Sequence, residues 1–134
     1  MNIENFSDLL QAARAQALPQ RLLFVFVGAE LPDDASPAQR MGFERGEGGA
    51  LVPALCVDKS PQELLSFDAL VQEAGQFAAP WRMVFAAALS GVGLTPPDSE
   101  QTDKALNAMV ESIQRGEISR YLAFDRQGFP VELE

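Results

Sequence analysis

The chain has 134 residues, 47% hydrophobic and 22% charged, which suits a single folded domain over residues 1–134 rather than a disordered segment. Ten basic and 19 acidic side chains give a formal net charge of −9, which argues against nucleic acid or a membrane surface as the partner. The apolar runs are too short to span a bilayer, and the first residues lack the pattern of a signal peptide. We therefore expect a cytoplasmic protein.

The chain contains no histidine and a single cysteine, Cys56. Without histidine it lacks the commonest general base and the usual metal ligand, and one cysteine cannot form an internal disulfide or a thiolate cluster. We accordingly expect no metal and no cofactor. These absences weigh against an enzyme.

The first predicted element is a helix over residues 6–17, with Asn5 as its N-cap and Leu18-Pro19 as its end. A strand over residues 21–28 follows, rich in Phe and Val. A long Gly- and Pro-containing connection comes next. Within it, Ser36 and the residues after it form a capping-box pattern that predicts a short helix up to about Arg45.

A second strand is predicted over residues 50–57, and Ser60-Pro61-Gln62-Glu63 is a capping box that predicts a helix from residue 60 to about residue 78. Residues 82–89 form the third predicted strand. This strand–helix–strand unit has a suitable length for a parallel, right-handed crossover.

The last long helix is predicted to begin at Asp98 or Ser99 and to end at Gly116. Residues 121–125 and 129–133 then form two strands of a hairpin, joined by a three-residue connection that ends in glycine. Because Pro130 cannot donate a backbone hydrogen bond, the terminal strand is expected at the edge of the sheet.

Three apolar runs, at residues 22–27, 51–57 and 83–89, determine the expected fold class. Strands that are apolar on both faces need cover on both faces. We therefore expect an α/β or α+β domain, in which a mixed sheet of four or five strands carries three main helices and ends in a C-terminal β-hairpin.

Polar residues at the ends of these strands are the candidate ligand contacts: Asp58, Lys59, Ser60 and Ser90. Ser60 can instead serve only as a helix N-cap, and Asp58 and Lys59 as exposed turn residues. Cys56 lies close by, and it is either a redox-sensitive thiol or a small residue packed in a strand.

Trp81, Phe129 and Val131 are the candidate contacts for a protein partner. Tryptophan often concentrates binding energy at interfaces, although Trp81 can equally cap the core. An edge strand offers unpaired backbone groups to a partner or to a second copy of the chain.

The whole chain resembles a set of small uncharacterised proteobacterial proteins. Three segments carry this likeness: Leu22-Leu23-Phe24-Val25-Phe26, Gly48-Gly49-Ala50-Leu51-Val52-Pro53 and Tyr121-Leu122-Ala123-Phe124-Asp125-Arg126. Some of those carry a ribonucleotide reductase alpha-subunit label. That activity needs several cysteines and a far longer barrel, which this chain does not have. The segment from Leu51-Val52-Pro53 to Ser60-Pro61-Gln62-Glu63-Leu64 is similar to the N-terminal domain of SseB-type proteins, and this likeness covers about the first half of the chain. This second likeness implies an interaction or secretion-associated role and transfers no catalytic residue.

The sequence thus favours a non-catalytic protein-interaction module that binds a protein partner or forms a homodimer. The alternative is a small-ligand-binding protein or an enzyme that uses the region from Asp58 to Ser60.

Overall fold

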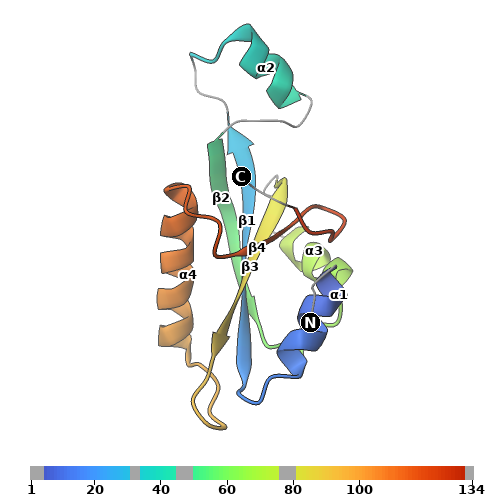
Figure 1. The fold of residues 1–134 in the computed structure, drawn as a ribbon, viewed down its shortest axis with the longest axis vertical. Coiled ribbons are helices and arrows are strands. Elements are labelled where there is room, and N and C mark those ends of the chain that lie inside the picture. The colour runs from blue at the N-terminus through green and yellow to red at the C-terminus, as the bar shows by residue number, and fades with distance from the viewer. Residues whose placement is uncertain (1–4, 31–33, 45–49, 76–80, 132–134) are drawn as a thin grey trace.

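The computed structural model describes residues 5–30, 34–44, 50–75 and 81–131. Helices and strands alternate along these residues, and the sheet stands between two helical layers (Figure 1). The elements are α1 (Phe6–Arg14), β1 (Gln20–Glu30), α2 (Pro37–Glu44), β2 (Ala50–Lys59), α3 (Phe67–Gly75), β3 (Met83–Ser90), α4 (Ser99–Gln114) and β4 (Leu122–Phe124).

The four strands form one sheet in the order β2-β1-β3-β4, and every neighbouring pair is antiparallel. The expected fold class and strand number are confirmed, but the sheet is antiparallel rather than mixed. β2 and β3 do run in the same direction, because each is antiparallel to β1, which lies between them. The crossover through α3 therefore passes over β1 instead of joining adjacent strands.

Cover on both faces of the central strand is confirmed. Leu22 through Val27 in β1 are all buried, and their side chains alternate between two cores. On one face, Leu22, Phe24 and Phe26 pack with α1 and α3. On the other, Leu23, Val25 and Val27 pack with the apolar stripe of α4, formed by Leu106, Met109 and Ile113. Among the described helices, α4 is the one that covers this side of the sheet (Figure 1).

Phe6 occupies the centre of the first core. Its ring lies 5.7 Å from that of Phe24, 5.0 Å from that of Phe67 and 5.4 Å from that of Phe124, measured between centroids. The last two contacts are edge-to-face, the geometry that aromatic pairs favour. This single side chain therefore ties α1 to β1, α3 and β4.

The predicted helix ends agree with the structure at several places. The Asn5 side chain accepts a hydrogen bond from the backbone of Asp8, and reciprocal capping boxes begin α2 at Ser36 and α4 at Asp98. α4 ends in a left-handed glycine, Gly116, with φ of 77°. The N–H groups of Gly116 and Glu117 bond the carbonyls of Ile113 and Ser112, which is the Schellman arrangement.

The helix expected to start at Ser60 begins instead at Phe67. The Ser60–Glu63 capping box does form, but it closes only one turn, and Ser66 then caps α3 by accepting from the Ala69 N–H. Arg14 donates to the carbonyls of Pro61 (3.0 Å) and Leu64 (2.8 Å) and so holds this turn against the end of α1. α1 itself ends at Arg14, three residues before its expected end. The expected end of the α3 helix lies outside the described residues.

The expected C-terminal hairpin forms in a reduced shape. β4 spans three residues, and the returning arm makes a bridge between Phe124 and Pro130. Gly128 adopts φ of 87° in the connection, as its position predicts. Residues 132–134 of the predicted last strand lie outside the described residues.

Candidate functional site

The predicted ligand residues at the end of β2 form hydrogen bonds and ion pairs with other side chains of the same chain. Arg21 Nε donates to Asp58 Oδ2 at 2.7 Å, and Lys59 Nζ lies 2.8 Å from Glu73 Oε1 of α3. Successive strand residues point to opposite faces, and Lys59 accordingly pairs on the α3 side. The structure therefore does not bring Asp58 and Lys59 together.

The two predicted serines also have partners. Ser60 Oγ accepts from the Glu63 N–H at 3.2 Å, and Ser90 Oγ accepts from Gln20 Nε2 at 2.9 Å. Within the described ranges, no three side chains of the Asp, Glu, His or Cys type lie close enough together to hold a metal ion. A ligand site at these strand ends stays a prediction. Arg21 joins Asp58 to Glu63, whose Oε1 lies 3.5 Å from Arg21 Nη1, so the charged side chains gathered here pair with one another.

Cys56 lies on β2, exposed at the edge of the sheet. Partial burial of its sulfur raises the pKa of the thiol above the ordinary value of 9.0. Burial disfavours the thiolate, which is the reactive form.

The raised pKa predicts how Cys56 reacts with a thiol reagent. At pH 8 the folded chain should react more slowly than the unfolded chain, because less thiolate is present, and its rate should keep rising above pH 9. Iodoacetamide labelling followed by mass spectrometry over a pH series measures this. A native rate at pH 7 above that of the unfolded chain would contradict the prediction and favour the redox-sensor hypothesis.

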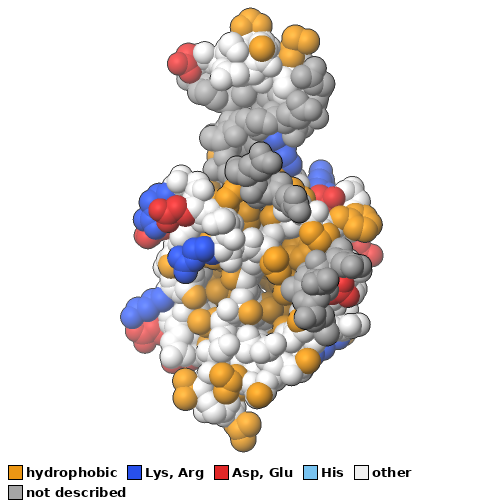
Figure 2. Space-filling view, viewed as in Figure 1, with side chains coloured by type: hydrophobic (Ala, Val, Ile, Leu, Met, Phe, Trp, Pro, Cys, Tyr) orange, Lys and Arg blue, Asp and Glu red, His pale blue; other side chains and the backbone are white. Residues whose placement is uncertain are grey.

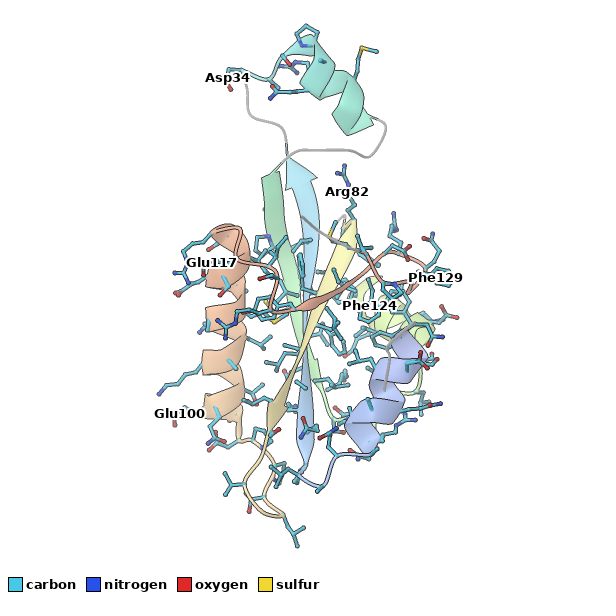
Figure 3. All side chains as sticks on the ribbon, viewed as in Figure 1. Asp34, Arg82, Glu100, Glu117, Phe124 and Phe129 are labelled. Atoms are coloured by element: carbon cyan, nitrogen blue, oxygen red, sulfur yellow. The ribbon has the colours of Figure 1, made fainter. Side chains whose placement is uncertain are left out.

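The three residues predicted to contact a partner have different environments. The Trp81 ring packs edge-to-face on Phe26 at 4.9 Å and lies 5.2 Å from the Arg126 guanidinium, while staying partly exposed. Val131 is half-buried against the core beneath α4. Phe129 is 60% exposed, on the connection after β4 (Figure 3). Trp81 thus caps the core and still presents surface.

The outer edge of β2 carries features that hinder further strand pairing. Ala54 is the extra residue of a β-bulge, since Phe26 pairs with Leu55 and Val27 with Pro53. Pro53 cannot donate a hydrogen bond, and Asp58 at the end of the strand is charged. Proline, bulges and charges are devices by which natural proteins block sheet edges.

The opposite edge of the sheet is closed along β4 by the returning chain. The Val131 N–H donates to the Ala123 carbonyl at 2.8 Å, and the Asp125 N–H donates to the Phe129 carbonyl at 2.9 Å. β4, however, pairs with β3 only from Val84 to Ala86. Four further residues of β3, Ala87 to Ser90, have no strand on that side among the described residues; we call them the free edge of β3.

An open pocket of about 360 Å³ lies beside the free edge. It is lined by Leu9 of α1, by three consecutive alanines of β3 and by the segment that enters β4: Ala86, Ala87, Ala88, Arg120, Tyr121 and Leu122. Figure 2 shows hydrophobic side chains along the middle of this face, over the strands, with charged side chains toward its margins. The small alanine side chains let another chain approach the backbone closely.

The direction of the β3 backbone groups follows from the hydrogen bonds around it. Ala123 bonds the returning chain, so its partner Phe85 directs its own N–H and C=O toward β1. The Gly91 N–H also points that way, since it donates to the Pro19 carbonyl. By alternation, Ala88 and Ser90 direct their N–H and C=O groups outward from the sheet.

The sequence predicted the sheet edge at the C-terminal strand, and the returning arm that bridges Phe124 through Pro130 does lie outside β4. The unpaired part of β3 was not predicted. The predicted strand lengths contained a signal for this unpaired part, because the third strand was predicted with eight residues and the first strand of the hairpin with only five. The sequence did not show that these two strands would be neighbours, so the unmatched residues could not be located.

Comparisons with protein-family models, with curated proteins and with solved structures find no match to this chain. No helix among the described residues is long and apolar enough to cross a membrane.

Proposed function

We propose that this chain is a non-catalytic protein-interaction module that binds an extended polypeptide segment along the free edge of β3. The observation that carries the proposal is the extension of β3 beyond its partner β4, next to an open pocket. Strand addition at a sheet edge derives affinity from main-chain hydrogen bonds and selectivity from side-chain pockets. The outward groups of Ala88 and Ser90 supply the first, and the pocket supplies the second.

The contrast between the two edges of the sheet supports this assignment. β2 has proline, a bulge and a charged end, whereas Ala87, Ala88, Leu89 and Ser90 include none of these. An unprotected edge carries a risk of aggregation. A partner strand that covers the edge removes that risk and gives these four residues a function.

A random peptide library displayed on phage, panned against the purified chain, tests the proposal. Enriched peptides should be rich in β-forming residues, and their binding should weaken about tenfold in Ala88→Pro, as expected for about 1.4 kcal/mol from one lost backbone hydrogen bond. Ala88→Ser is the matched control, because it keeps the N–H, and it should bind within about twofold of the parent chain.

Circular dichroism and thermal unfolding of both variants check that the fold is intact. Proline is tolerated at an edge where the N–H faces solvent, so Ala88→Pro should fold. Peptides that bind the parent chain and a folded Ala88→Pro equally well would contradict the proposal, as would the failure of a monomeric chain to enrich any peptide.

A further inference from the structure

The turn that follows β3 is held rigidly by its backbone. The N–H and C=O groups of Val92 and Thr95 bond each other at 2.9 Å in both directions, and Gly93 at the bend has φ of 58°. A Cβ at Gly91 would collide with the Thr95 carbonyl and lie 2.9 Å from Pro96 Cα, so the chain packs closely on that glycine. The turn at residues 92–95 therefore has a fixed shape.

This fixed turn presents apolar side chains to solvent. Val92 is 79% and Leu94 is 92% exposed, the two highest values among the large hydrophobic residues exposed in the structure. Hydrophobic side chains are visible at the corresponding end of the molecule, below the strands in Figure 2. Apolar side chains that are exposed next to one another, as a contiguous patch, are typical of an interaction surface.

We infer that a second copy of this chain occupies the free edge of β3, in a twofold dimer that places the 92–95 turn of each copy in the pocket of the other. The inference rests on the proposed function and names its partner. It brings together three features that the single chain leaves unsatisfied: the unpaired strand, the open pocket and the exposed turn.

The register of such a dimer follows from the directions of the backbone groups. Two antiparallel β3 strands pair through outward groups. The register that uses the groups of both residues sets Ala88 of one copy opposite Ser90 of the other, and the twofold axis then passes beside Leu89. This register brings the second copy's Gly91 opposite Ala87 and its Val92 up to the point where Leu122 already pairs with Ala86.

The second copy's strand has to end opposite Ala86, because Leu122 of the first copy already pairs there. That is also where its own chain leaves the strand and enters the turn at Val92. The turn of the second copy thereby arrives at the alanines, Tyr121 and Leu122 of the pocket.

The charges of this surface are compatible with self-association. The chain carries a net charge of −9, so two copies repel each other unless their contact avoids acidic groups. The free edge, the turn at residues 92–95 and the pocket lining contain no carboxylate, and Arg120 is their single charged residue. Added salt should strengthen the dimer by screening the remaining repulsion.

Sedimentation velocity of the full chain over a concentration series, from roughly 1 to 300 μM, measures the association. We expect a reversible dimer whose dissociation constant falls as salt is raised. Leu94→Asp should weaken the dimer at least about tenfold, because the leucine side chain no longer fills the space between the alanines and Leu122 and the carboxylate loses water there. Leu65→Asp is the matched control: Leu65 is 78% exposed, lies outside the contact, and its substitution should leave the dimer unchanged.

A cysteine at the twofold axis tests the register. Leu89 pairs with itself across the axis in a non-hydrogen-bonded position, where Cα atoms approach to about 4.5 Å, within the range of a disulfide. Leu89→Cys in a Cys56→Ser background should therefore give a covalent dimer on mild oxidation, and Leu65→Cys in the same background should not.

A chain that stays monomeric at every concentration and salt, or a dimer indifferent to Leu94→Asp and without the Leu89→Cys cross-link, would overturn the inference. If the chain is monomeric but still binds library peptides at β3, then the inference that the partner is a second copy is wrong and the proposed function is not affected. If neither peptides nor a second copy bind, the proposed function fails as well.

Discussion

Phe6→Ala should lower the free energy of unfolding by about 3–5 kcal/mol. The Phe6 side chain is 3% exposed and touches aromatic rings from three other elements. Its removal loses the burial of the ring and leaves a cavity where α1, β1, α3 and β4 meet. Domains of this size have about 5–15 kcal/mol of stability in total, so the variant should unfold at a much lower urea concentration.

Phe129→Ala is the matched control, since it removes the same ring from a site that is 60% exposed. Its effect on unfolding should stay within about 0.5 kcal/mol. Equal losses in the two variants would mean that the aromatic cluster does not stabilise the fold in the way its geometry indicates. Phe129 is also a predicted partner contact. Phe129→Ala can therefore change the binding of a partner without changing the free energy of unfolding.

The cover on both faces of the sheet could be predicted because β1 is apolar at every position from Leu22 to Val27. That pattern needs no knowledge of the neighbours, only of the cost of exposing both faces. The helix caps were predictable for a similar reason. A Ser or Asp with a polar partner three residues later satisfies backbone groups locally, as at Ser36 and Asp98.

Strand order depends on contacts between distant residues, and no local pattern encodes it. The strand–helix–strand segment from β2 to β3 has the length of a parallel unit, yet β1 lies between those strands. The capping box at Ser60 forms as its sequence predicts, but a capping box alone does not determine how far a helix continues. Here Ser66 starts a new helix after one turn.

The candidate surface was harder to predict than the fold, because it consists of what the neighbours leave uncovered. The free edge of β3 exists only because β4 is three residues long, and β4 was predicted with five. Asp58 and Lys59 are candidate ligand contacts by chemical type and position alone. Their ion pairs with Arg21 and Glu73 arise from residues 37 and 14 positions away, beyond the reach of motif reasoning.

Gly91→Ala should destabilise the chain by about 3 kcal/mol, the upper part of the range for overpacking a tightly packed site. The new Cβ would meet backbone atoms, the Thr95 carbonyl and Pro96 Cα, which cannot rotate away as a side chain can. The 92–95 turn would have to move, and the path from β3 to α4 would move with it. Urea unfolding followed by circular dichroism measures the loss.

Gly93→Ala separates this steric effect from the general cost of replacing a turn glycine. Gly93 has positive φ, and no atom lies within 4 Å of the Cβ that alanine would add. Its replacement should therefore cost only about 1 kcal/mol, the penalty of a left-handed backbone for an L-residue. If Gly91→Ala is no more destabilising than Gly93→Ala, the close packing at Gly91 does not fix the turn. The rigid presentation of Val92 and Leu94, on which the dimer depends, would then lose its structural basis.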